Sequence, residues 1–244
     1  MNELHLFAGS GGGILGGILC GHTCVCAVEI EPYCRQVLLQ RQRDGVLPWF
    51  PIWDDVRTFD GKPWRGIVDI VCGGFPCQDI SVAGHQTGLD GERSGLWKEM
   101  RRIIGEIQPR FTFVENSPNL ALLGGVRVVA DLTSMGFGCK WGIMGAGSVG
   151  SVCEGERLWI FATSAHCSML ESVDVPAYIQ PYSEKSRRRQ YSRAIGAMLS
   201  QDDYSALKRN PNDVARGMDR LKAIGNGQVP RCAALAWRIL SKVD

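Results

Sequence analysis

The chain has 244 residues and 45% of them are hydrophobic, enough for one large domain, or one domain with a small appendage. No apolar run approaches the roughly 20 residues of a membrane span, and the first residues lack the basic and apolar regions of a signal peptide, so we expect a soluble, cytoplasmic protein. The net charge of +2 hides an asymmetry, because residues 163–244 are net basic and residues 1–162 are net acidic. A basic C-terminal third suits a polyanionic partner.

The ten cysteines raise the question of disulfides or a metal centre. No Cys-x-x-Cys pair occurs, and Cys24 and Cys26 lie in an apolar run that reads as a strand. We therefore expect them to be small core residues in a reducing compartment, and we expect no metal.

The first candidate site follows a short strand predicted over residues 4–8. A glycine-rich turn, residues 9–13, comes next, and a helix is predicted from Ile14 onward. A strand, a glycine turn and a helix start together make a cofactor cradle, although a purely structural loop has the same pattern. The next strand, predicted over 23–30, places Glu29 about 20 residues past the turn, where an acid binds ribose hydroxyls in dinucleotide-type folds.

The second candidate site is the turn that ends at Cys77. An apolar run over 67–72 predicts a buried strand, and Gly73-Gly74-Phe75-Pro76 then turns the chain. Cys77 thus follows the carboxyl end of a strand, where open α/β sheets build their sites. The alternative is a buried, inert thiol, but such a turn would be a costly way to fill a core.

The remaining elements alternate between helices and strands. Residues 78–95 form a long loop, which in a compact domain is usually functional or mobile. A strand over 111–114 ends on Glu115. Residues 163–212 have no steady period, and their arginines and tyrosines suit phosphate contact and base stacking, with a solvated basic loop as the alternative. Helices are predicted over 32–43, 96–107, 120–135 and 231–240, strands over 140–144 and 159–162, and a loop over 49–57.

Taken in order, these pieces resemble the sequence blocks of the DNA cytosine-5 methyltransferases. The matching stretches are Leu6-Phe7-Ala8-Gly9-Ser10-Gly11-Gly12, Glu29, Asp55-Val56, Phe75-Pro76-Cys77-Gln78, Glu115-Asn116, Glu156-Arg157 and Gly225-Asn226. The resemblance implies a Rossmann-like α/β fold, mostly parallel, with helices on both faces. It also implies a catalytic and cofactor-binding domain over 1–162, a small target-recognition region over 163–212 and a returning C-terminal segment over 213–244.

The cofactor that the resemblance implies is S-adenosyl-L-methionine, with S-adenosyl-L-homocysteine as its product. Glu29 would bind its ribose, Phe7 and Ile30 would flank its adenine, and Asp55 would contact the adenine edge. The full set of expected cofactor contacts is Phe7, Ala8, Gly9, Gly11, Gly12, Glu29, Ile30, Asp55, Val56, Pro76, Leu96, Asn226 and Gly227.

The resemblance also implies the catalytic roles. Cys77 would be the nucleophile, Glu115 the acid that shares a proton with the base, and Arg157 would hold the carbonyl oxygen of the base and the thiol loop. The partner would be double-stranded DNA, from which the cytosine must be flipped out. The expected DNA contacts are Gln78, Ser81, Arg93, Arg187, Arg188 and Arg189.

One block departs from the family pattern. The family usually has Gln-x-Arg-x-Arg or His-Lys-Arg-Glu-Arg where this chain reads Cys153-Glu154-Gly155-Glu156-Arg157, so the first arginine is replaced by Gly155. A catalytically impaired or partner-dependent DNA-binding member therefore stays open as an alternative. So does a tRNA cytosine-5 methyltransferase, although that branch usually reads Pro-Pro-Cys-Gln-Pro-Phe-Thr at the nucleophile. Residues 219–221 look most like short phage and prophage members. We expect a monomer in a bacterial or phage-infected cell, with a cognate restriction enzyme as a further candidate partner.

Overall fold

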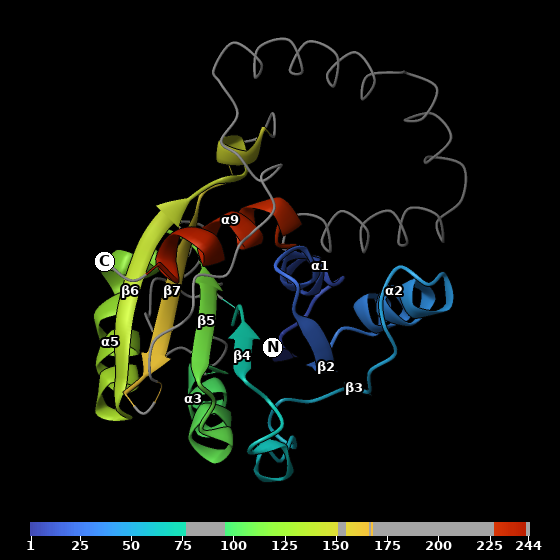
Figure 1. Ribbon diagram of the computed structural model, residues 1–244, viewed down its shortest axis with the longest axis horizontal. Helices are drawn as coiled ribbons and strands as arrows, with labels where there is room; N and C mark the ends of the chain where they lie inside the picture. The colour runs from blue at the N-terminus through green and yellow to red at the C-terminus, as the bar shows by residue number, and fades with distance from the viewer. Residues whose placement is uncertain (77–95, 151–154, 166, 168–226, 243–244) are drawn as a thin grey trace.

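A mixed seven-stranded sheet forms the centre of the computed structural model, which describes residues 1–76, 96–150, 155–165, 167 and 227–242 (Figure 1). The strand order is β3-β2-β1-β4-β5-β7-β6. β7 runs antiparallel to both of its neighbours, and the other pairs are parallel. The predicted, mostly parallel α/β sheet is therefore confirmed. The strands are β1 (Asn2–Leu6), β2 (Thr23–Val28), β3 (Ile52–Trp53), β4 (Ile70–Gly73), β5 (Phe111–Asn116), β6 (Phe137–Met144) and β7 (Arg157–Ser164).

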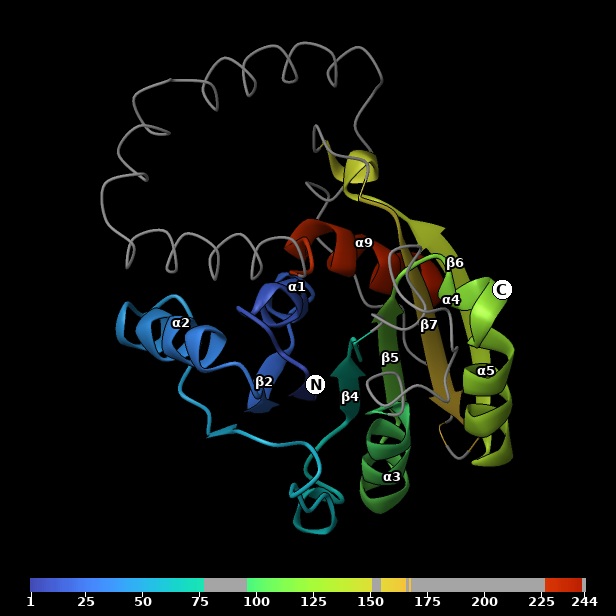
Figure 2. The ribbon, with the colours of Figure 1, turned by 180° about the vertical axis from the view of Figure 1, so that it is seen from behind.

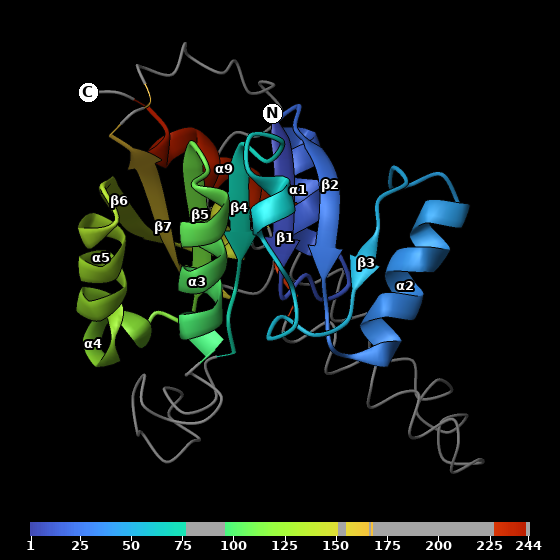
Figure 3. The same cartoon turned by 90° about the horizontal axis from the view of Figure 1, so that it is seen from below.

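Helices cover both faces of the sheet, as the sequence predicts. α3 and α5 lie on one face, and α1 and α9 lie on the other (Figure 3). α9 comes from the C-terminal end of the chain and lies beside α1, near the N-terminus (Figure 2). The helices are α1 (Gly12–Leu19), α2 (Pro32–Arg43), α3 (Trp97–Ile107), α4 (Leu120–Leu123), α5 (Gly125–Ser134) and α9 (Pro230–Leu240), with single 3₁₀ turns at η1 (Lys62–Trp64) and η4 (Ala146–Val149).

The core has two main layers because alternate residues of a strand point to opposite faces. Val71 of β4 packs in the layer that contains Met100 and Ile104 of α3. Its neighbour Ile70 packs in the other layer, around Trp237 of α9. The indole of Trp237 meets three phenylalanine rings edge-on, at centroid distances of 6.0, 5.4 and 5.0 Å, from Phe111, Phe113 and Phe161. This contact ties the C-terminal helix to the middle of the sheet.

Several predicted strand bounds were wrong: the strands predicted over 4–8, 23–30, 140–144 and 159–162 are β1, β2, β6 and β7, with the bounds given above. β4 begins at Ile70 and not at Ile67, because the Ile67 and Val68 amides donate to the carbonyl of Trp64 in a turn. The segment predicted as a loop over 49–57 contains the short strand β3, which pairs with the end of β2. The start of β4 and the presence of β3 both depend on backbone hydrogen bonds, which the hydrophobic pattern of the sequence does not reveal.

The helix predicted over 120–135 is two helices. The chain is extended at Gly124, with φ of 175°, so α4 ends there and α5 begins at the next residue. Two consecutive glycines at 124–125 explain the break, since glycine has little helix preference. The helix predicted over 32–43 has the bounds of α2.

Candidate active site

The carboxyl ends of β1, β4 and β5 meet at one edge of the sheet. Leu6, the last residue of β1, pairs with Gly73 of β4, and Gly73 pairs with Val114 of β5. The turn after β1, the turn after β4 and the Glu115 side chain therefore lie next to one another. Open α/β sheets bind ligands at this edge.

The turn after β1 is left-handed at several residues. φ is +55° at Phe7, +54° at Gly9 and +90° at Gly11. A β-carbon on Gly11 would lie 2.8 Å from Leu38 Cδ2 of α2, so the turn packs closely on its inner side. At Gly9, by contrast, no heavy atom of the described chain lies within 4 Å of the β-carbon position. The turn therefore has a closed side toward α2 and an open side at Gly9.

Glu29 joins this turn to the end of β2. The residue is 6% exposed, and its Oε2 accepts a hydrogen bond from the Gly9 amide at 2.6 Å. Its Oε1 accepts one from the Glu31 amide at 2.8 Å. A carboxylate has about four lone-pair positions, so each oxygen can still accept a further donor. Ile30, beside it, is 55% exposed.

The other described residues predicted to contact the cofactor lie in different environments. The Asp55 carboxylate is held by Arg57, with Oδ2 2.6 Å from Nη2, and these hydrogen bonds lower the pKa of Asp55. The side chain of Val56 is buried in the main core. Leu96 and Phe7 are partly buried and pack against that same core. Ala8, Pro76 and Gly227 are partly exposed.

The predicted acid and arginine form a pair at the sheet edge. Glu115 is 9% exposed at the end of β5, and Arg157 begins the antiparallel strand β7, with its Nε 3.0 Å from Glu115 Oε1. Gln228 Nε2 donates to the other oxygen, Oε2, at 3.2 Å. Burial raises the pKa of Glu115, and it outweighs the Arg157 charge and the two hydrogen bonds, which lower it. Burial thus shifts the ionisation of this carboxyl toward the protonated form, and its two partners fix its orientation.

Two residues of this site were not among the predicted site residues. Asn116 Nδ2 donates to the carbonyl of Phe75 at 3.1 Å, and Phe75 packs against Trp97 at 5.5 Å between ring centroids. This bond fixes the turn two residues before Cys77. Gln228 holds the acid itself. Asn116 stands inside the Glu115-Asn116 block, and Gln228 lies two residues after the Gly225-Asn226 block. A polar side chain in or beside each block was therefore the available signal.

Some of the predicted site residues lie outside the part of the chain that the structure describes. They are Cys77, Gln78, Ser81, Arg93, Arg187, Arg188, Arg189 and Asn226. Cys153 and Glu154, from the block that departs from the family pattern, lie outside it too.

A family model described as C-5 cytosine-specific DNA methylase matches residues 1–227. The chain belongs to this family. Among curated relatives, the Type II methyltransferase M.CviJI of Paramecium bursaria Chlorella virus IL3A is 31% identical over 65% of this chain and 42% of its own length. M.HhaI of Haemophilus parahaemolyticus is 35% identical over 48% of this chain and 34% of its own. The chain thus spans less than half the length of these relatives.

Solved structures show that the methylase chain shares the fold of this group. A prophage-encoded DNA modification methyltransferase of E. coli has a TM-score of 0.59 at 22% identity, covering 76% of this chain and 53% of that one. The S. pombe Dnmt2 methyltransferase has a TM-score of 0.55 at 16% identity, covering 70% and 51%. The predicted Rossmann-like methyltransferase fold is confirmed.

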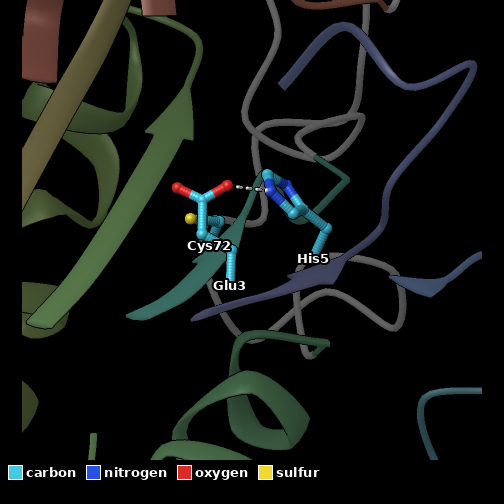
Figure 4. A group of neighbouring side chains, drawn as sticks. All are labelled: Glu3, His5 and Cys72. Atoms are coloured by element: carbon cyan, nitrogen blue, oxygen red, sulfur yellow. Dashed lines mark hydrogen bonds and ion pairs between the residues drawn. The ribbon is translucent and has the colours of Figure 1, made fainter. Parts of the chain in front are cut away.

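A buried polar cluster of the methylase lies beneath the edge (Figure 4). Glu3, His5 and Cys72 are residue types that can hold a metal, and one ligand atom from each lies within 4.8 Å of the others. The two carboxylate oxygens of Glu3 already pair with His5 Nε2 at 2.8 Å and His22 Nδ1 at 2.7 Å. Burial raises the pKa of the Cys72 thiol well above its ordinary value. Glu3, His5 and His22 therefore form a hydrogen-bonded network inside the core.

Cys24 and Cys26 lie in the core, as the sequence predicts. Cys24 and Cys26 are each 2% exposed, and both are free thiols. Burial raises the pKa of Cys26 to about 12, so the thiol stays protonated. Among the described residues, no helix is long and apolar enough to cross a membrane.

Proposed function

We propose that the protein is a DNA (cytosine-5-)-methyltransferase that uses S-adenosyl-L-methionine. The observation that carries the proposal is the buried Glu115 carboxyl, held by Arg157 and Gln228 at the edge where the chain turns toward Cys77. Burial raises the pKa of this carboxyl, which favours a proton that it can share with a ring nitrogen. Family membership supplies the cytosine carbon 5 as the reacting atom.

The turn after β1 fits the cofactor. Glu29 is buried, and its oxygens retain capacity for the two ribose hydroxyls, while the space at Gly9 is open. Phe7 and Ile30 would flank the adenine from the ends of β1 and β2, and Asp55 would reach its edge. The chemistry that S-adenosyl-L-methionine supplies when bound is an electrophilic methyl group on a sulfonium sulfur.

The protein groups then act on the base. The Cys77 thiolate adds to carbon 6 of cytosine and forms a carbon–sulfur bond, which makes carbon 5 nucleophilic. The Glu115 carboxyl, when protonated, shares its proton with nitrogen 3, where the addition places charge, and this help is worth about 10²–10⁴-fold. Arg157 keeps the carboxyl oriented and neutralises charge nearby. After methylation a base removes the proton from carbon 5, and the carbon–sulfur bond breaks to return the thiolate.

The substrate of this reaction would be cytosine in double-stranded DNA. A paired cytosine presents neither face to a thiol, so it must leave the stack at a cost of a few kcal/mol. The predicted contacts of residues 78–95 and of the basic segment, Arg187, Arg188 and Arg189, would offset that cost through phosphate contacts.

The test is to express the chain in a host without cytosine methylation and to sequence its DNA for 5-methylcytosine. Methylation in one recurring context is expected, and Cys77→Ser should abolish it. Cys139→Ser, a change at a partly buried free thiol on β6, is the matched control and should keep it. Full activity in Cys77→Ser would refute the covalent mechanism, and methylation of tRNA in place of duplex DNA would reassign the substrate.

A partner-dependent enzyme is a second candidate, which Gly155 favours. This residue stands where the family usually has an arginine, and it is exposed with φ of +46°. A positive group that would contact DNA is therefore lacking at this position. Tight binding of cofactor and DNA without product, followed by activity when cell extract is added, would support this candidate over the autonomous enzyme.

A further inference from the structure

Gln228 touches three parts of the candidate active site, although it lies just before α9, near the C-terminal end of the chain. Its Nε2 donates to Glu115 Oε2 at 3.2 Å. A β-carbon on Gly12 would overlap its backbone carbonyl, and one on Gly13 would overlap its Oε1. A β-carbon on Gly74 would lie 2.6 Å from Glu115 Oε2 and 3.4 Å from Gln228 Nε2. Gln228 therefore sits between the start of α1, the turn after β4 and the acid.

The glycines around Gln228 explain how it is held. Gly12 and Gly13 open the helix that follows the cofactor turn, and only hydrogen-sized side chains let the Gln228 backbone approach there. Its carboxamide oxygen points at α1 and its nitrogen at Glu115, so the orientation of the amide is defined by both ends. A shorter or branched side chain could not span the two contacts.

The chemistry of the contact suits a positioning role. The amide group is neutral over the whole working pH range, so it donates to Glu115 without competing for its proton. Arg157 occupies Oε1 and Gln228 occupies Oε2, which fixes the plane of the carboxyl group and leaves one lone-pair direction on each oxygen for the base. Because the carboxyl is buried, a small rotation would carry it out of reach of a flipped cytosine.

We propose that Gln228 is a positioning residue for the general acid, aligning the Glu115 carboxyl with the cofactor turn. The inference rests on the proposed function, since it assigns Glu115 the role of acid. Neither the sequence blocks nor the family assignment gives Gln228 a part in the reaction.

The charged and titratable groups that face Glu115 from the described elements are few. Arg157 comes from β7, and the Cys232 thiol comes from α9. The pKa of Cys232 is raised to about 11 by burial and by the Glu115 charge, so this thiol is neutral at working pH. A substitution of Gln228 should therefore change the pKa of Glu115 and not that of another nearby group. The hydrogen bond from Gln228 lowers the pKa of Glu115, so its removal should move the titration to higher pH.

The experiment compares the full chain with Gln228→Met, which keeps the length and removes the donor. Two quantities are measured: the ¹³C chemical shift of the Glu115 carboxyl against pH, assigned with Glu115→Gln, and the methyl-transfer rate on duplex DNA against pH. We expect the carboxyl titration of Gln228→Met to move to higher pH, and kcat to fall by up to about 10²-fold with little change in KM. Gln228→Glu keeps size and polarity, so it serves as a second variant should Gln228→Met not fold. The added carboxyl of Gln228→Glu should also raise the pKa of Glu115, because a second negative charge nearby disfavours its ionised form.

Gln40→Met is the matched control. Gln40 Nε2 also donates to a carboxylate, Asp44 Oδ1 at 2.8 Å, but on the exposed face of α2. Gln40→Met should leave both the pKa of Glu115 and the methyl-transfer rate unchanged. An unchanged Glu115 titration in Gln228→Met and Gln228→Glu would overturn the inference, even if thermal stability fell, because a merely structural contact would lower stability alone.

The two proposals fail in different ways. If the wild-type chain methylates no nucleic acid, with or without added cell extract, while the Glu115 titration still moves in Gln228→Met, the proposed function is overturned and the contact between Gln228 and the acid is supported. If the wild-type chain methylates DNA and neither the titration nor kcat responds to Gln228, the positioning role is overturned and the proposed function stands.

Discussion

Arg157 Nε lies 3.0 Å from Glu115 Oε1, joining the first residue of β7 to the end of β5. β7 is antiparallel to β5, so its beginning reaches the carboxyl edge of the sheet. The arginine side chain is 32% exposed and the glutamate side chain 11%. The pair therefore joins a buried carboxyl to a partly solvated guanidinium, an arrangement that orients the carboxyl while burial still raises its pKa.

Glu115→Gln should keep the fold and lower kcat by about 10²–10⁴-fold, because a carboxamide cannot share an acidic proton with nitrogen 3. The rate is measured by single-turnover methyl transfer with saturating DNA and cofactor. Glu106→Gln is the control, since Glu106 also pairs with an arginine, Arg102 at 2.8 Å, at the far end of α3. Equal loss in both variants would contradict a chemical role for Glu115.

Gly12→Ala should destabilise the protein by about 1–3 kcal/mol, because the new methyl group meets the Gln228 backbone carbonyl, which cannot rotate away. It should also weaken cofactor binding, since α1 begins at this residue. Urea unfolding and calorimetric titration with S-adenosyl-L-methionine measure the two effects. Gly105→Ala, on the exposed face of α3 with Met135 Cε at 3.6 Å, should instead be neutral or stabilise by up to about 1 kcal/mol.

Glu3→Gln should remove a contribution to the free energy of unfolding that depends on pH. The folded protein lowers the pKa of Glu3 from 4.5 to about 2 through its two histidine partners, which overcome the opposing effect of burial. A folded pKa below the unfolded one stabilises the native state above about pH 4.5, and this stabilisation is lost as the pH falls toward 2. The difference corresponds to roughly 3 kcal/mol.

Urea unfolding of wild type and Glu3→Gln at several pH values between 3 and 7 checks this expectation. The variant should be less stable at pH 7, and the gap should narrow as the pH falls through the acidic range. Asp54→Asn, at an exposed acid, should give no such trend. If the difference in free energy of unfolding between wild type and Glu3→Gln stayed constant with pH, the ionisation of Glu3 beside its two histidines would not be the cause.

Gly155→Arg should strengthen DNA binding by restoring a positive side chain that the family pattern usually has. One added phosphate contact should make the slope of log K against log salt steeper by about 0.9. Because φ is +46° at this position, the substitution should cost about 1–2 kcal/mol of stability. Fluorescence anisotropy across a salt series measures the slope. Gly21→Arg is the control, since Gly21 is exposed with φ of +76° at the end of α1 away from the site.

Local pattern was sufficient for the parts of the site that are continuous in the chain. The glycine turn after β1, Glu29 at the end of β2 and Glu115 at the end of β5 could all be predicted, because each depends on a strand's apolar run and the residue that ends it. The fold class followed from the same alternation of strands and helices.

The relationships between these parts were decided by the tertiary structure. Gln228 and Glu115 are 113 positions apart, and Asn116 and Phe75 are 41 apart, so no periodicity links them. Their contacts depend on which strands are neighbours, on the reversal of β7 and on α9 packing beside α1. The sequence by itself thus determined which residues stand at strand ends. Only the packing of distant segments decided that Arg157 and Gln228 would hold the same carboxyl group, because a side-chain contact requires two elements to meet in space.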